Sequence, residues 1–181
     1  MGSGPRFPRD LVEPAATLLT DRLVGRVVLC GSLRRLAATC GDIDLVISDG
    51  SAVVSDLVSM GLTVTSVGEP RTRLHMEHPS LRCGIEVDVW APRPGHLGAC
   101  VMHATGSARL NMVMRRWGFM HGLQLSWQGV RDRETGLWIA GETEEDCCEA
   151  LGWPCVPPEM RDRPDRWIVP YLEEMERMEG V

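Results

Sequence analysis

Two aspartates, Asp42 and Asp44, are separated by one residue in the segment Gly41-Asp42-Ile43-Asp44. In a β-strand, residues i and i+2 point to the same face, so both carboxylates are expected at one spot. Upstream, Gly31 and Ser32 predict a small turn that opens a helix, and a helix N-terminus favours phosphate groups. Two carboxylates beside a phosphate-binding turn suit a divalent cation that carries a nucleoside triphosphate. The pattern therefore predicts nucleotidyl transfer.

Asp88 is the candidate for a third carboxylate. The alternation in Ile85-Glu86-Val87-Asp88-Val89-Trp90 predicts a strand with its aliphatic residues in the core and Asp88 on the opposite face. If this strand lies beside the strand of Asp42, the three acids converge. Two metal ions about 3.5–4 Å apart would then activate the attacking oxygen and stabilise the leaving group.

The composition limits the class of protein. The chain has 181 residues, of which 44% are hydrophobic, enough for a core in one domain or two small ones. No apolar run is long enough to span a bilayer, so we expect no membrane association. The 7 cysteines include no CxxC pair, which favours reduced thiols and a cytoplasmic protein. The chain contains no lysine, which excludes Schiff-base lyase chemistry.

The charge is unevenly distributed. A formal net charge of -6 argues mildly against tight nucleic-acid binding. However, a group of arginines in the middle of the chain is opposed locally only by Asp132. These arginines are Arg109, Arg115, Arg116, Arg131 and Arg133. Such a local basic patch can follow phosphates while the whole molecule stays acidic.

The elements that must position these residues fall into two halves. In the first half we expect helices over residues 14–23, 33–39 and 51–60, and strands over 26–30, 43–48, 62–67, 71–75 and 81–90. Pro14 is assigned to the first turn of its helix. In the second half we expect helices over 96–105, 107–120, 143–151 and 165–178, and strands over 123–127, 129–131 and 137–140. Thr143 resembles the start of a capping box.

Four sequence blocks together resemble the palm and thumb of the family X DNA polymerases. In chain order they are GSLRR at 31–35, GDIDLVI at 41–47, EVDVW around Asp88, and HATGSARLNMVMRRWGFMHGL at 103–123. A fifth block, GETEEDCCEALGWPCVPPEMRD at 141–162, resembles the closing segment of the thumb in bacterial members. The resemblance implies an α+β fold, with a nucleotidyltransferase palm built on a mixed β-sheet flanked by helices, plus a small α/β thumb. It implies a palm over residues 1–98, a thumb over 99–164 and a C-terminal extension over 165–181.

The resemblance also implies roles for individual residues. Asp42, Asp44 and Asp88 match the metal-binding catalytic acids, and Asp88 is the candidate to accept the proton of the primer 3′-hydroxyl. The residues that match nucleotide contacts are Gly31, Ser32, Arg35, Arg9, His103, Gly106 and Asn111. Those expected to contact DNA are Arg115, Arg116 and Arg109. The implied cofactors are two Mg²⁺ ions, with Mn²⁺ as a substitute.

The implied reaction is the addition of nucleotides to a primer 3′-hydroxyl, in short-gap DNA repair. The expected partners are a DNA primer-template or gapped DNA, a deoxynucleoside triphosphate, and a recruiting protein, with the enzyme itself a monomer. The lyase and helix-hairpin-helix domains of the family would precede Phe7, so a minimal form without them is expected.

Two alternative functions stay open. His103-Ala104 replaces the usual Tyr-Phe pair that helps to exclude ribonucleotides. A template-independent or ribonucleotide-tolerant transferase is therefore the second hypothesis. The third is a non-catalytic module that binds DNA ends.

Overall fold

The computed structural model describes residues 5–48 and 52–180. The chain divides into two compact units, Met1–Arg93 and Pro94–Val181. The division comes shortly before the predicted end of the palm at residue 98, and the assignment of the units as palm and thumb stays a prediction. No helix within the described ranges is long and apolar enough to cross a membrane.

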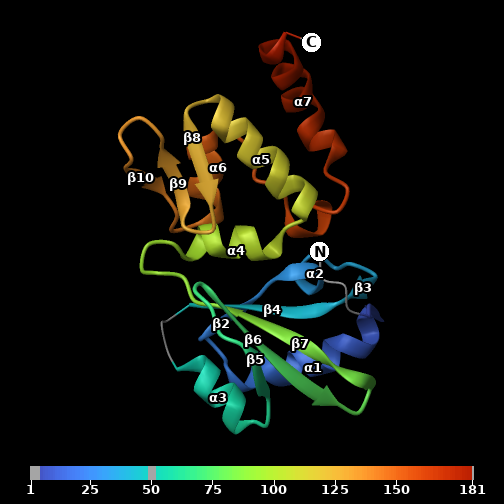
Figure 1. The fold of residues 1–181 in the computed structure, drawn as a ribbon. Helices are drawn as coiled ribbons and strands as arrows, with labels where there is room; N and C mark the ends of the chain where they lie inside the picture. The colour runs from blue at the N-terminus through green and yellow to red at the C-terminus, as the bar shows by residue number, and fades with distance from the viewer. Residues whose placement is uncertain (1–4, 49–51, 181) are drawn as a thin grey trace. The chain divides into compact units, whose positions relative to one another are not determined.

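The first unit is built on a five-stranded sheet (Figure 1). Its strands are β2 (Val27–Leu29), β4 (Asp42–Ile47), β5 (Thr63–Ser66), β6 (Arg71–His78) and β7 (Leu81–Trp90). The spatial order is β2-β4-β7-β6-β5. The β4 and β7 strands run parallel, and every other neighbouring pair is antiparallel, so the sheet is mixed.

Two helices, α1 (Arg9–Arg22) and α3 (Val53–Ser59), cover one face of this sheet (Figure 1). Leu19 of α1 and Leu57 of α3 are fully buried against strand residues such as Leu45 and Val87. The aliphatic positions of β4 and β7 therefore face the core, and the alternate polar positions are left on the other face. Those polar positions carry the predicted catalytic acids.

Two local predictions in this unit are wrong. Pro14 lies inside α1, which begins at Arg9, and not in its first turn. The helix expected over residues 33–39 is instead the short α2 (Gly31–Arg34). It stops because Leu36 has a φ of 56°, a left-handed conformation that ends a right-handed helix. The chain then forms β3 (Thr39–Cys40), which pairs with β1 (Phe7–Pro8). Ser51, the expected start of α3, lies outside the described residues.

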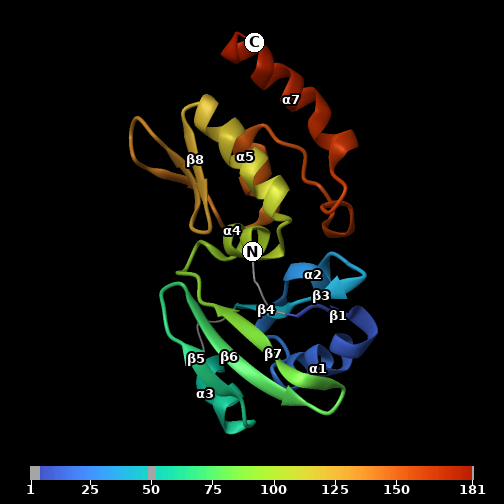
Figure 2. The same cartoon turned by 45° about the vertical axis from the view of Figure 1, so that its right-hand side comes forward.

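The second unit packs helices against a small antiparallel sheet (Figure 2). Its elements are α4 (Leu97–Thr105), α5 (Ala108–Met120), β8 (Leu123–Ser126), β9 (Gly129–Asp132), β10 (Trp138–Ala140), α6 (Glu144–Leu151), the 3₁₀ turn η1 (Pro158–Met160) and α7 (Asp165–Glu179). The sheet order is β10-β9-β8. Trp117 of α5, Leu151 of α6 and Ile168 of α7 belong to one buried cluster, so α7 shares the core of this unit.

The N-termini of two helices in the second unit are capped by side chains. The Thr143 hydroxyl accepts a hydrogen bond from the backbone N–H of Asp146, as expected for the start of α6. Ser107 caps α5 and also donates to the carbonyl of Arg161. The α+β fold class predicted from the sequence is confirmed: a mixed five-stranded sheet is flanked by helices.

Candidate functional site

The three predicted catalytic aspartates lie on neighbouring strands of the first unit. The parallel register of β4 and β7 pairs Asp44 with Asp88 and Asp42 with Glu86. All four acidic residues are on the polar face of the sheet, opposite the aliphatic core. The strands β4 and β7 are therefore neighbours, which is the condition under which the three aspartates were expected to converge.

The turn before α2 closes directly onto Asp44. Gly31 has a φ of +62°, and a Cβ at this position would lie 2.1 Å from an Asp44 carboxylate oxygen. Only glycine fits both the backbone conformation and the space. The preceding residue, Cys30, donates its N–H to the carbonyl of Asp44 at 2.8 Å, which ties the turn to β4.

Ser32 follows in the same turn with only 6% of its surface exposed. Its hydroxyl has no hydrogen-bond partner among the described residues. A buried hydroxyl without a partner is costly, so such groups usually await a ligand or water. This agrees with the phosphate contact predicted for Ser32.

The close approach of the acids changes their protonation. Burial, followed by the negative charges of Asp42 and Asp88, raises the pKa of Asp44 to about 7. A hydrogen bond from the indole N–H of Trp90, 3.3 Å from Asp44 Oδ1, opposes this rise. Burial and the charge of Asp88 likewise raise the pKa of Asp42. The site has an excess of negative charge that a cation would relieve.

Asp88 is held by two arginines that the sequence analysis did not select. Arg73 donates to both carboxylate oxygens, with Nε to Oδ1 at 2.7 Å and Nη2 to Oδ2 at 3.0 Å. Arg71 donates from Nη1 to Oδ2 at 2.9 Å. Both come from β6, where their spacing of two residues places them on the polar face. The two-residue spacing of the arginines is visible in the sequence. Only the pairing of Arg73 with Asp88 across β6 and β7 shows that these arginines reach the site.

The donor set of the site suits a hard divalent cation, because Mg²⁺ and Mn²⁺ prefer carboxylate oxygens. Even so, no three acidic, histidine or cysteine side chains in the described ranges are arranged as a ready metal site. The Asp88 carboxylate instead faces Arg71 and Arg73. Metal binding by all three aspartates would require Asp88 to exchange these partners.

The predicted nucleotide contacts of the second unit form a cluster between α4 and α5. Asn111 donates from Nδ2 to the backbone carbonyl of His103 at 2.9 Å. Arg115 Nη2 lies 2.9 Å from Nδ1 of the same histidine. Gly106, with a φ of +73°, joins the two helices and ends α4. The structure therefore brings together His103, Asn111 and Arg115.

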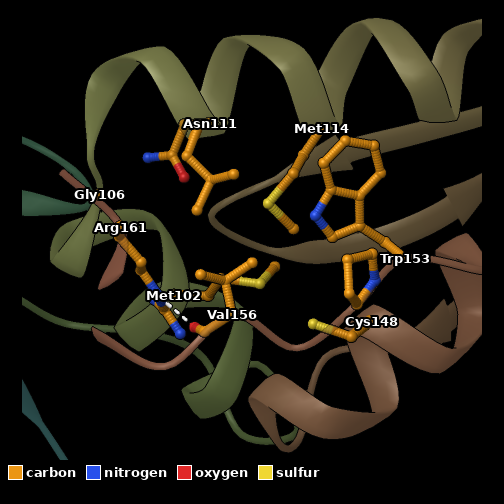
Figure 3. A pocket seen from close by; sticks show the side chains of 10 residues that line it. Met102, Gly106, Asn111, Met114, Cys148, Trp153, Val156 and Arg161 are labelled. Atoms are coloured by element: carbon orange, nitrogen blue, oxygen red, sulfur yellow. Dashed lines mark hydrogen bonds between the residues drawn. The ribbon is translucent and has the colours of Figure 1, made fainter. Parts of the chain in front are cut away.

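A narrow pocket runs from Gly106 and Asn111 along α5 (Figure 3). Its free volume is about 10 Å³, comparable to a single water molecule. Met102, Met114 and Val156 line it, and Arg161 closes it with a hydrogen bond from Nε to the Val156 carbonyl at 2.8 Å. The pocket is part of the packing of this unit and does not have the size of a nucleotide site.

The remaining predicted ligand contacts are arginines with acidic neighbours. Arg9 forms an ion pair with Glu13 on α1 at 2.7 Å. On α5, Arg109 pairs with Asp165 at 3.0 Å, and Arg116 pairs with Glu179. Both of these acids belong to α7. Arg35 is the C-cap residue directly after α2, and its charge opposes the rise in the pKa of Asp44. Their contacts with nucleotide or DNA stay predictions.

The second unit carries the resemblance to known proteins. Residues 100–162 match the family model of the DNA polymerase beta thumb, which is 63 of the 181 residues. The match supports a relationship to the DNA polymerase beta-like family X and points to a DNA-polymerase-related nucleotidyltransferase that binds DNA. It begins in α4 and ends after η1, so α7 lies outside it. No curated protein matches the chain.

Proposed function

We propose that this protein is a DNA-directed DNA polymerase of family X that fills short gaps during repair. The observation that carries the proposal is the thumb match in the second unit together with three aspartates on one sheet face in the first. The reaction joins the primer 3′-oxygen to the α-phosphorus of a deoxynucleoside triphosphate. The bond between the α-phosphorus and its bridging oxygen breaks, and pyrophosphate leaves.

The residues of the first unit divide this work. Asp88 accepts the proton of the 3′-hydroxyl, which makes the oxygen a better nucleophile. Ser32 and the backbone of the Gly31 turn bind the β- and γ-phosphates, with Arg35 and Arg9 as further phosphate ligands. In the second unit His103, Gly106 and Asn111 position the sugar and base of the incoming nucleotide.

Asp42, Asp44 and Asp88 would hold two Mg²⁺ ions or, in their place, Mn²⁺. When bound, the ions supply positive charge that stabilises the triphosphate and the leaving pyrophosphate. The raised pKa of Asp44, caused by burial and by Asp42 and Asp88, supports this assignment, because crowded carboxylates favour cation binding.

The DNA would be held by Arg109, Arg115 and Arg116 on α5. We expect a monomeric cytoplasmic enzyme acting on gapped DNA or a primer-template, recruited by a protein partner because its own basic surface is small.

Primer extension on a gapped duplex tests the proposal, with Asp88→Asn as the decisive variant. Loss of the proton acceptor should lower the rate by about 10²–10⁴-fold. Asp21→Asn, an exposed aspartate on α1, is the matched control and should leave the rate unchanged. Circular dichroism of both variants verifies folding. Unaltered extension by Asp88→Asn would contradict the assignment.

The same assay separates the alternatives. Extension that ignores the template base, or that uses ribonucleotides equally well, would support the second hypothesis, which rests on the small side chain of Ala104. DNA binding without extension by the unaltered protein would support a non-catalytic DNA-end module.

A further inference from the structure

A polar pocket of about 400 Å³ lies beside Asp88 in the first unit. It is bounded by the end of β5, the segment leading into β6, and the C-terminal residue of β7. The lining residues are Ser66, Gly68, Glu69, Pro70, Arg71, Arg73 and Trp90. No sequence motif selected this pocket, and it is the size of a small-molecule site.

The polar sheet face changes sign from β4 to β6. Asp42 and Asp44 lie on β4, Asp88 on β7, and Arg71 and Arg73 on β6. With neighbouring strands 4.7–4.9 Å apart, the arginine backbone lies about 10 Å from that of the β4 aspartates. The acidic side next to the Gly31 turn suits the cations and the triphosphate. The basic side suits a different phosphate.

Arg71 and Trp90 form a surface suited to a nucleotide. The Arg71 guanidinium lies 5.2 Å from the centre of the Trp90 ring, a cation–π arrangement that orients its N–H donors. The ring itself is held by its hydrogen bond to Asp44. A fixed aromatic side chain beside an arginine is a common way to contact the sugar, base and phosphate of a single strand.

Arg71 and Arg73 share the single negative charge of Asp88, and Arg73 Nε also lies 3.8 Å from a carboxylate oxygen of Glu86. Arginine stays protonated at all physiological pH values. A divalent cation at Asp88 would take this shared partner away, so that Arg71 would lose its ion pair and Arg73 would keep only Glu86. A phosphate in the adjacent pocket would restore both the charge balance and the hydrogen bonds.

We propose that Arg71 and Arg73 form a phosphate site for the 3′-terminal segment of the DNA strand, which becomes available when a divalent cation takes Asp88 from them. The inference deepens the proposed function and depends on it. Because coupling between two ligands is reciprocal, the cation should strengthen DNA binding and DNA should strengthen cation binding. The incoming triphosphate is assigned to the Gly31 turn on the other side of Asp44. The phosphate at Arg71 and Arg73 is therefore supplied by the backbone of the DNA strand.

Fluorescence anisotropy of a labelled gapped duplex, with Ca²⁺ or with EDTA, measures this coupling without catalysis. For the unaltered protein we expect Ca²⁺ to lower the dissociation constant about tenfold. In Arg71→Ala and in Arg73→Ala the effect of Ca²⁺ should fall to about twofold or less. Arg82→Ala is the matched control, since this exposed arginine of β7 lies at the far end of the strand, and it should retain the full effect.

The variant Asp88→Asn provides an independent test, because it removes the negative charge beside Arg71 and Arg73 without any metal. It should bind the duplex about tenfold more tightly than the unaltered protein in EDTA, and adding Arg71→Ala should reverse the gain. Weaker or unchanged binding by Asp88→Asn would overturn the inference, as would a full Ca²⁺ effect in both arginine variants.

A deoxynucleoside triphosphate alone, titrated with Ca²⁺, distinguishes the two sources of phosphate. Its affinity should be the same in Arg71→Ala and in the unaltered protein. If Arg71→Ala lost affinity for the triphosphate and not for the duplex, the pocket would bind the nucleotide. That result would overturn the assignment of the pocket to the DNA strand. Absence of duplex binding by the unaltered protein would overturn the proposed function as well.

Discussion

The charged sheet face of the first unit and the α5 helix of the second unit both hold arginines against acids of the same chain, at different depths. In the first unit the acid is Asp88, whose side chain is 2% exposed and receives three hydrogen bonds from Arg71 and Arg73. In the second unit the pair Arg109–Asp165 is 60% and 63% exposed.

The difference in depth predicts a difference in energy. Charged hydrogen bonds to a buried carboxylate are each worth about 1.5–3 kcal/mol, whereas exposed ion pairs are worth about 0–1 kcal/mol. Changes in the first unit should therefore affect folding and activity strongly. The α5 pairs of the second unit should exchange readily with the phosphates of DNA.

Gly31→Ala should have the largest effect on stability. A left-handed conformation costs a non-glycine residue about 1–2 kcal/mol, and the clash of its Cβ with Asp44 adds about 1–3 kcal/mol. We expect a total loss of about 4 kcal/mol in urea unfolding. Gly25→Ala is the matched control, because Gly25 has a φ of +73° but no atom within 4 Å of the added Cβ. It should lose only about 1 kcal/mol. Equal losses in the two variants would contradict the close contact with Asp44.

Asp44 should make the metal-free protein less stable as the pH rises. Burial and the charges of Asp42 and Asp88 raise its folded-state pKa from 3.8 to about 7, so the folded protein binds this proton more tightly than the unfolded chain does. The resulting stability is fully present below about pH 4 and is lost as the pH rises through about 7.

The difference in unfolding free energy between the unaltered protein and Asp44→Asn isolates this effect. Measured in EDTA, it should change by on the order of 3 kcal/mol between pH 4 and pH 7. The control variant Asp21→Asn should show the same pH dependence of the unfolding free energy as the unaltered protein. A difference between Asp44→Asn and the unaltered protein that does not vary with pH would show that Asp44 titrates normally.

The sequence predicted most of the fold because its signals there are local. Alternating polarity gave the buried and polar faces of β4 and β7, and turn residues separated most elements correctly. The thumb resemblance was confirmed for residues 100–162. The short α2 was missed because no local pattern in the sequence marks the left-handed conformation of Leu36 or the pairing of β3 with β1 that follows it.

The contacts of the site were harder to predict for the same reason. Arg71 and Arg73 reach Asp88 only through the register of β6 on β7. Arg116 meets Glu179 across a sequence separation of 63 residues. From the sequence, Asp132 was expected to be the only acid opposing the central arginines, but the acids of α7 oppose Arg109 and Arg116 in the folded unit. Charge distribution along the chain is therefore a poor guide to charge distribution on the surface.

The acids of α7 should weaken DNA binding by α5, which is the smallest effect we expect. Arg109 and Arg116 are seven residues apart, so they lie on one side of the helix about 10 Å from each other along its axis. That distance equals about three base-pair rises along the axis of a DNA duplex. Asp165 and Glu179 compete with the DNA phosphates for both arginines.

Replacing both acids, as Asp165→Asn with Glu179→Gln, should tighten binding to a gapped duplex about threefold, because each exposed pair is worth less than about 1 kcal/mol. Arg116→Ala should weaken binding and lower the slope of log K against log salt by about 1. Glu173→Gln, an exposed α7 acid with no ion pair to α5 among the described residues, controls for net charge. An equal gain from Glu173→Gln would show that the general negative charge of α7, and not its contacts with α5, opposes DNA.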